Sequence, residues 1–299
     1  MAIHASFFFL LAILLKGIKL TELLILIIIQ LITTDLFNPA VNSTTFNFTN
    51  HCPHTVWPAT LAGASSPALS TTGFQLAASA SFSLHAPSNW SGRMWARTNC
   101  STNDFGEFHC LSGDCGTGKL QCHGAGGIPP ASLVEFTLNG ADGKDFYDVS
   151  LVDGFNLPVE VAPSGGRPGC DGATSCAADI KSLCPPELRE PAATADGSVV
   201  GCNSACWVFG LDEYCCTGKY NDPDKCGPTK YSIVFKKACP LAYSYPYDDE
   251  TSTFTCIGAD YLITFCPSKV IGRPPFYVIN HLKQNRLFRG GTLANESFT

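Results

Sequence analysis

Three cysteines and two histidines lie close enough in one stretch to bind a metal ion or to form disulfides. Cys110, Cys115 and Cys122 have the spacing C-x4-C-x6-C, and His109 and His123 adjoin the first and the last of them. This spacing is wrong for a zinc knuckle, which takes a short C-x2–4-C pair, but the two nearby histidines mean that a metal site has to be considered. The other cysteines of the chain favour disulfides instead, and we expect neither a metal ion nor a cofactor.

The number of cysteines indicates an oxidising compartment. All 16 lie between Cys52 and Cys266, an even count that allows eight disulfides. A reduced cytosolic protein of this size rarely carries so many, so the sequence predicts a secreted protein. The spacing alone does not fix the pairing. It requires only that the adjacent Cys215 and Cys216 have different partners.

The charge of the chain argues against a nucleic-acid partner. Residues 43–267 contain 12 Lys and Arg against 22 Asp and Glu, a net charge of −10, whereas residues 268–299 carry a net charge of +4. Nucleic-acid binding needs a basic surface, which residues 43–267 do not supply. The excess of acid could serve solubility alone. The alternative is that part of it gathers in one cleft.

The stretch Gly106–Cys122 resembles the signature of the thaumatin-like proteins, with Ser112 in place of their threonine. Five further blocks resemble the same family in the same order: Thr45–Trp57, Gly92–Cys100, Asp145–Asn156, Tyr214–Thr217 and Tyr243–Asp249. Together they extend over residues 45–267. Agreement in so many separate blocks is far more specific than any one motif.

The resemblance implies an all-β fold, with a flattened antiparallel β-sandwich core, two smaller disulfide-rich lobes and an acidic interdomain cleft. It places the sandwich at residues 43–97, 129–176 and 240–267, the small lobe at 98–128 and the large lobe at 177–239. It also implies the disulfides Cys52–Cys266, Cys100–Cys110, Cys115–Cys122, Cys170–Cys256, Cys176–Cys239, Cys184–Cys202, Cys206–Cys215 and Cys216–Cys226. The first of these would join the two ends of the domain.

One arginine and four acids carry the functional part of the resemblance. Carried over block by block, they are Arg93, Glu135, Asp148, Asp153 and Asp249. Four carboxylates that face one concavity create a focused negative field and accept hydrogen bonds from sugar hydroxyls. Arg93 would hold part of that charge in place through a fork-shaped contact.

Asp148 and Asp153 pose a geometric difficulty because they are five residues apart. On a regular strand, an odd offset directs two side chains to opposite faces. Both can reach one cleft only if the strand bends, bulges or ends before Asp153, and Gly154 favours an end there. The alternative is that Asp153 caps the turn and only Asp148 faces the cleft.

The resemblance implies a secreted plant defence protein, pathogenesis-related and antifungal, that binds β-1,3-glucan or another fungal cell-wall polysaccharide as a monomer. A weak endo-β-1,3-glucanase is the alternative, because two suitably separated carboxyl groups can hydrolyse a glycosidic bond. Val134 and Phe136 stand where the family more usually has Ala and Tyr, which leaves activity open. We expect Phe155 and Tyr245 to be exposed for stacking on sugar rings.

Short alternating segments must position these residues. Apolar and polar residues alternate in Thr45–Thr49, Arg93–Arg97, Ser132–Leu138 and Tyr261–Phe265, which predicts strands of a β-sandwich. The last of these strands would lie beside the first. Tyr231–Phe235 is also predicted as a strand. In the cysteine-rich region Gly165–Lys237, we expect one short helix at Ala173–Leu183.

The two ends of the chain lie outside the predicted domain. Leu23–Leu31, preceded by two lysines, resembles the apolar part of a secretory signal, with cleavage expected within Thr33–Asn42. We expect residues 1–42 to be a signal peptide that delivers the protein to the apoplast or cell wall, and the alternative is an uncleaved anchor that tethers it to a membrane. Residues 268–299 are predicted to be a disordered tail. Among the sequons, Asn89 is the best placed for glycosylation.

Overall fold

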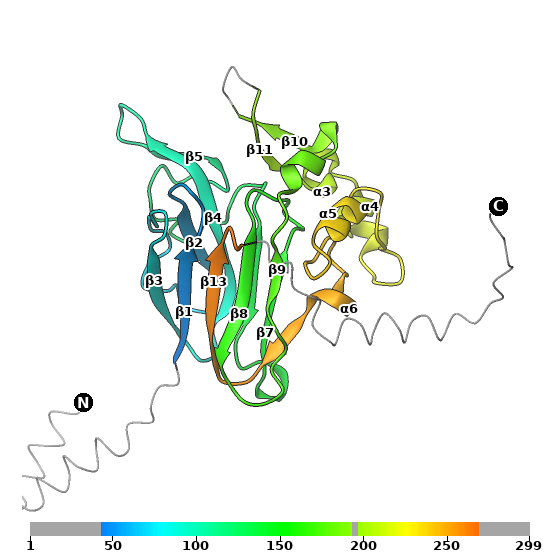
Figure 1. Cartoon of the computed structure of the whole chain (residues 1–299). Coiled ribbons are helices and arrows are strands. Elements are labelled where there is room, and N and C mark those ends of the chain that lie inside the picture. Colours follow the sequence, from blue (N-terminus) through cyan, green and yellow to red (C-terminus); the bar gives the residue numbers. More distant parts are fainter. Residues whose placement is uncertain (1–42, 193–196, 269–299) are drawn as a thin grey trace, which may run out of the picture. The chain divides into compact units, whose positions relative to one another are not determined.

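Two β-sheets form the main body of the protein in the computed structural model, which describes residues 43–192 and 197–268 (Figure 1). The first sheet contains, in spatial order, β3 (Ser81–Pro87), β1 (Ser43–Asn50), β13 (Ala259–Phe265), β8 (Val159–Gly165) and β9 (Thr174–Cys176). The second contains β12 (Phe254–Cys256), β7 (Asp145–Ser150), β6 (Leu133–Thr137), β4 (Ser91–Thr102) and β2 (Trp57–Ala62), and β5 (Phe108–Ser112) pairs with β4. A smaller sheet pairs β10 (Arg189–Pro191) with β11 (Val199–Cys202).

Aromatic side chains fill the space between the two main sheets. Phe46 on β1 lies 4.6 Å from Phe136 on β6, measured between ring centroids. Tyr261 on β13 lies 5.2 Å from Tyr147 on β7, and all four rings are buried. Each ring occupies an inward position of an alternating strand, so the two sheets pack face to face around one core. The predicted all-β sandwich is therefore confirmed.

The first and the last strands of the domain lie side by side. Phe46 pairs with Tyr261 in a ladder that continues to Asn50 and Phe265. The predicted neighbourhood of these strands is confirmed, but β1 and β13 run parallel, so the sandwich is not antiparallel throughout. Parallel strands need a long connection between them. Here the connection from β1 to β13 contains all the other strands and helices described.

Eight disulfides link the described residues, and they are the pairs that the family resemblance implies. They are Cys52–Cys266, Cys100–Cys110, Cys115–Cys122, Cys170–Cys256, Cys176–Cys239, Cys184–Cys202, Cys206–Cys215 and Cys216–Cys226. The cysteines of Gly106–Cys122 are thus all bonded to sulfur, so they are not metal ligands.

The middle of the strand β4, residues 94–98, is buried on both of its faces. Met94 and Ala96 belong to the core between the sheets, whereas Trp95 packs in a second cluster with the disulfide-bonded Cys115 and Cys122. Trp95 and the stretch around these cysteines are held together by a hydrogen bond from the indole nitrogen to the carbonyl of Gly113, 2.8 Å long. Near its start, β4 carries the partly exposed side chain of Arg93 on the outer surface of the sheet.

Helices occupy the region between β9 and β12. They are η2 (Ile180–Leu183), η3 (Pro186–Leu188), α3 (Ala205–Phe209), α4 (Asp212–Cys215), η4 (Gly218–Tyr220), α5 (Ser232–Ala238) and α6 (Asp249–Ser252), while η1 (Ala141–Gly143) precedes β7. The helices α3, α4 and α5 group together on one side of the sheets (Figure 1).

Two predicted elements of this region are wrong. The predicted strand Tyr231–Phe235 lies largely in the helix α5, whose buried residues Ser232 and Phe235 are three positions apart. A run of five residues is too short to separate a period of two from a period of 3.6. The predicted helix Ala173–Leu183 is instead the strand β9 followed by the 3-10 turn η2. Two prolines follow that turn directly after Cys184, and the residue before a proline avoids helical geometry.

Several predictions fall outside what the structure tests. Residues 1–42 and 269–299, with the expected signal or anchor and the expected tail, lie outside the described residues. Among the described residues, no helix is long and apolar enough to cross a membrane. The boundaries of the two lobes stay predictions. Asn89 is exposed in the turn between β3 and β4, and its glycosylation stays a prediction as well.

Candidate functional site

Three neighbouring strands place three charged side chains in one row. The Cα atom of Arg93 on β4 pairs with that of Glu135 on β6, and Glu135 pairs in turn with Asp148 on β7. Cross-strand partners direct their side chains to the same face of a sheet. Their neighbours, such as Val134, point into the core, so the three charged side chains lie on the outer face.

A tight turn brings Asp153 to the same face. The strand β7 ends at Ser150, and the amide of Gly154 then donates to the carbonyl of Leu151 over 2.9 Å. Gly154 adopts a φ of 90°, which the absence of a Cβ atom permits. The carboxylate of Asp153 lies 3.6 Å from the guanidinium of Arg93. The odd offset from Asp148 is thus compatible with one cleft because the strand has ended before Asp153.

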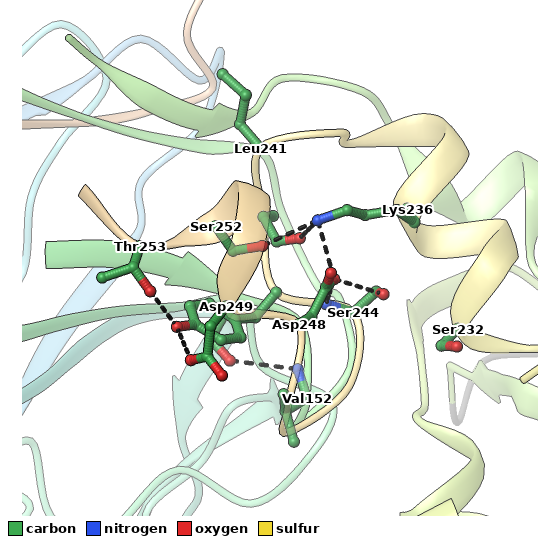
Figure 2. Close-up of polar contacts among 12 residues, drawn as sticks. Val152, Ser232, Lys236, Leu241, Ser244, Asp248, Asp249, Ser252 and Thr253 are labelled. Carbon is green, nitrogen blue, oxygen red and sulfur yellow. Dashed lines mark hydrogen bonds and ion pairs between the residues drawn. The ribbon is translucent and has the colours of Figure 1, made fainter. Parts of the chain in front are cut away.

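Asp249 reaches the row from a segment that is distant in sequence. Tyr243 lies beside β7, where its amide donates to the carbonyl of Val149 and its own carbonyl accepts from Leu151, each over 2.9 Å. The Tyr243 hydroxyl donates to the carboxylate of Asp249 over 2.6 Å and also contacts the hydroxyl of Thr253. Asp249 is the first residue of α6, and Figure 2 shows its carboxylate near Thr253.

These side chains line one open cleft of about 350 Å³. Its lining includes the five predicted residues, Arg93, Glu135, Asp148, Asp153 and Asp249, together with Leu133, Ser150, Val152, Tyr243 and Pro246. A second hollow of about 500 Å³ continues along the outer face of the sheet. The two hollows share Arg93, Glu135 and Asp148, and the second is also lined by Phe146, Thr137 and the Ala62–Ala64 loop. The site is therefore an elongated groove with one acidic half.

Burial raises the pKa of three of the acids, and repulsion between carboxylates adds to the shift in Asp148 and Glu135. For Asp148, burial first and then the charges of Glu135 and Asp249 raise the pKa to about 8. Burial also raises the pKa of Glu135 and that of Asp153, and in both cases the charge of Arg93 opposes the shift. The Oδ1 atom of Asp148 is buried and accepts no hydrogen bond from any described residue. At neutral pH, Asp148 in this site is therefore protonated.

The aromatic residues differ from expectation. Phe155 is fully buried, so the prediction that it stacks on a sugar is wrong. It follows Gly154 and pairs with Cys202, which directs its ring into the core. Tyr245 is partly exposed but lines a small separate pocket rather than the cleft. The aromatic side chains that reach the groove are Tyr243 and Phe146.

Sequence reasoning overlooked the role of Tyr243. Its hydroxyl group donates a hydrogen bond to Asp249, and its backbone amide and carbonyl are hydrogen-bonded to Val149 and Leu151 at the end of β7. The exposure of Phe146 in the groove, by contrast, could have been predicted from its spacing in the sequence. It is two residues from Asp148 on one strand, and residues two apart share a face, so a predicted outward Asp148 implies an outward Phe146.

Comparison with known proteins shows the family to which the chain belongs. A profile of the thaumatin family matches residues 50–267. Thaumatin-like protein 1 of Pyrus pyrifolia is 57% identical over 228 residues, which cover 76% of this chain and 92% of the relative. A protein of Prunus avium named glucan endo-1,3-beta-glucosidase is 51% identical over 244 residues, covering 81% of this chain and 98% of the relative. Pathogenesis-related thaumatin-like protein 3.5 of Cryptomeria japonica is 54% identical over 226 residues, covering 76% and 91%. The chain therefore belongs to the thaumatin family.

Proposed function

We propose that the protein is a secreted plant defence protein that binds β-1,3-glucan of fungal cell walls in the acidic groove. The observation that carries the proposal is the convergence of Arg93 and four carboxyl groups in one cleft from four separate parts of the chain. Burial in a cleft is unfavourable for carboxylates, so a ligand that supplies hydrogen bonds to them would gain from the arrangement.

The chemistry of a glucan fits the groove. Each sugar unit carries hydroxyl groups that both donate and accept hydrogen bonds, and the site offers carboxyl oxygens as acceptors beside the protonated Asp148. The buried Oδ1 atom of Asp148 has no partner among the described residues and could accept one of these bonds. The second hollow extends the site past the acids, and the ring of Phe146 there offers a face for a pyranose ring. A chain of several sugars therefore fits better than a single sugar.

A weak endo-β-1,3-glucanase is the second candidate. Hydrolysis requires one protonated and one ionised carboxyl group roughly 5–9 Å apart. Asp148, with a pKa of about 8, is suited to donate the proton at neutral pH, and Asp249 or Asp153 could act as the second carboxyl group. Glu135 lies directly beside Asp148 on the neighbouring strand. The name of the Prunus avium relative supports this candidate.

Two assays on the same preparation separate these functions. The parent protein is mixed with insoluble β-1,3-glucan and, as a control, with β-1,4-linked cellulose, and the bound fraction is measured after sedimentation. Specific retention on β-1,3-glucan is expected, and equal retention on both polymers would contradict the proposal. Release of reducing ends from a soluble β-1,3-glucan identifies hydrolysis. Asp148→Asn should abolish that release while much of the binding remains.

Secretion is part of the proposal. Eight disulfides form and persist in an oxidising compartment, which supports a location outside the cytosol. The proposal includes removal of a signal peptide within Thr33–Asn42, and the alternative is a retained anchor. Mass spectrometry of the mature N-terminus distinguishes the two, because an N-terminus that precedes Leu23 would contradict cleavage.

A further inference from the structure

The segment that carries Asp249 is tied to the helix α5 by one lysine. Lys236 lies in the last turn of α5, and its ammonium group is 2.9 Å from the carboxylate of Asp248. The same nitrogen donates to the carbonyl of Ala242 over 3.1 Å and to the hydroxyl of Ser252 over 2.9 Å. An ammonium group has three N–H donors, so each of them has an acceptor. Figure 2 shows Lys236 with Asp248 and Ser252 around its nitrogen.

The three acceptors all belong to the segment from Ala242 to Ser252. Asp248 precedes α6, and Ser252 is the last residue of this helix, so Lys236 contacts both of its ends. Ala242 precedes Tyr243, the residue whose hydroxyl bonds to Asp249. Asp248 is fixed further because its Oδ2 atom accepts from the amide and the hydroxyl of Ser244, over 3.0 and 2.9 Å.

The helix α5, which carries Lys236, is itself linked to the first main sheet by a disulfide. Cys239 follows α5 directly and is bonded to Cys176 on β9, a strand of the first main sheet. Both Lys236 and Asp248 are largely buried, with 26% and 12% of their side-chain surfaces exposed. Salt screens a partly buried ion pair less than a surface pair, and charge-assisted hydrogen bonds are short and strong, so this pair can hold a defined geometry. Lys236 is absent from the lining of the cleft and therefore acts behind it.

We propose that Lys236 is a positioning residue, which fixes the segment from Ala242 to Ser252 so that Tyr243 and Asp249 face the acidic cleft. The role rests in part on the proposed function, because it predicts that the loss of Lys236 weakens ligand binding without removing any group that touches the ligand. Small displacements of binding groups lower affinity strongly, since each hydrogen bond depends on distance and angle.

The first test measures the segment itself and needs no ligand. Lys236→Met keeps the length of the side chain and removes its charge and its donors. Lys237→Met is the matched control, because Lys237 is the next residue of the same helix and is exposed. Amide hydrogen exchange of residues 242–253, followed by mass spectrometry, should be about tenfold faster in Lys236→Met than in Lys237→Met. Equal exchange in the two variants would overturn the proposal.

A double variant guards against simple misfolding. Lys236→Met leaves the carboxylate of Asp248 buried without its cation, which destabilises a protein by itself. Lys236→Met with Asp248→Asn removes both charges. This double variant should fold with the parental circular dichroism and still show the faster exchange in residues 242–253. Restoration of parental exchange by Asp248→Asn would overturn the proposal, because the unpaired charge alone would then explain the single variant.

The last test asks whether Lys236 acts through Asp249. Affinity for a soluble β-1,3-glucan oligosaccharide should fall about tenfold in Lys236→Met. In an Asp249→Asn background the same change should have little further effect, whereas in a Glu135→Gln background it should keep its full effect. Equal effects in both backgrounds, or parental affinity of Lys236→Met, would overturn the positioning role. If the parent protein does not bind β-1,3-glucan, the proposed function fails, and the exchange experiment alone decides the role of Lys236.

Discussion

Asp248 and Asp249 are consecutive residues with different partners. The carboxylate of Asp248 is paired with Lys236 and accepts two hydrogen bonds from Ser244. The carboxylate of Asp249 accepts a hydrogen bond from Tyr243 and lines the cleft. Because the charge of Lys236 compensates that of Asp248, Asp248 adds little to the electrostatic field in the groove. The charge of Asp249, in contrast, raises the pKa of Asp148. The family resemblance selects Asp249, and the surrounding side chains give the physical reason.

The loss of glucan affinity caused by a single substitution in the cleft should increase with the number of charged groups that the substitution leaves without a partner. Glu135→Gln and Asp249→Asn keep the shape and remove one charge, so each should weaken glucan binding by about 0.5–1.5 kcal/mol. Arg93→Ala should weaken it more, because it leaves the acids without their cation. The ion pair of Arg93 with Asp153 is partly exposed and contributes little energy by itself. Titration calorimetry with an oligosaccharide measures these differences.

Unchanged affinity in all three variants, with parental circular dichroism, would show that the acidic cleft is not the ligand site. If the protein hydrolyses glucan, Glu135→Gln provides a further comparison. It should abolish hydrolysis and lower binding only modestly if Glu135 is one of the reacting carboxyl groups.

Asp148 should make the stability of the protein depend on pH. The pKa of Asp148 is about 8 in the folded protein, against about 3.9 in an unfolded chain. Between these values the folded state keeps a proton that the unfolded state has lost, so the free energy of unfolding decreases as pH rises from 4 to 8. Asp148→Asn removes this decrease. Its stability relative to the parent should therefore rise over that range in urea denaturation without reductant.

The exposed Thr102 provides the control for this measurement, because its side chain does not titrate. Thr102→Ala should differ from the parent by a nearly constant amount between pH 4 and pH 8. A constant difference for Asp148→Asn as well would contradict the protonated state of Asp148.

At the scale of elements, the site depends on where strands end. The row of Arg93, Glu135 and Asp148 follows from the pairing of three strands, but Asp153 joins it only because the turn after β7 reverses the chain. A Cβ atom at Gly154 would lie 2.6 Å from the carbonyl oxygen of Cys202. The turn therefore also fits closely against the strand β11.

Gly154→Ala should both destabilise the protein and weaken ligand binding. The substitution combines a positive φ with a steric conflict with backbone, and we expect a loss of about 1–3 kcal/mol in unfolding free energy. Gly227→Ala is the matched control, because no atom lies within 4 Å of the added carbon and its φ is not positive. Urea denaturation and oligosaccharide titration of both variants test this prediction. Equal stability of the two would contradict the account of the turn.

At the scale of the whole molecule, the disulfides connect segments that the sheets alone leave separate. Cys52–Cys266 joins residues 214 positions apart and closes the domain beside the parallel pair of β1 and β13. Cys176–Cys239 joins β9 to the end of α5, and Cys184–Cys202 and two further bridges lie within the helical region. This region contains few long strands or helices, so cross-links replace part of the stabilisation that a core would supply.

We expect no free thiol in the folded protein. Each disulfide contributes about 2–4 kcal/mol, so the protein should resist heat and proteases until a reductant is added. Thiol titration of the denatured, unreduced protein checks this directly. Two or more free cysteines per chain would contradict the prediction, and unchanged protease resistance after reduction would contradict the stabilising role of the bridges.

The sequence by itself determined the family, the β-sandwich and the identity of the five charged residues. Strand alternation is local and the family blocks are contiguous, so both can be read without knowledge of long-range contacts. The tertiary structure decided which faces are buried. Phe155 turned out to be in the core and Phe146 in the groove, because burial depends on the strands that pack against each residue. It also revealed Lys236 behind Asp249, since contacts between residues far apart in sequence leave no local pattern.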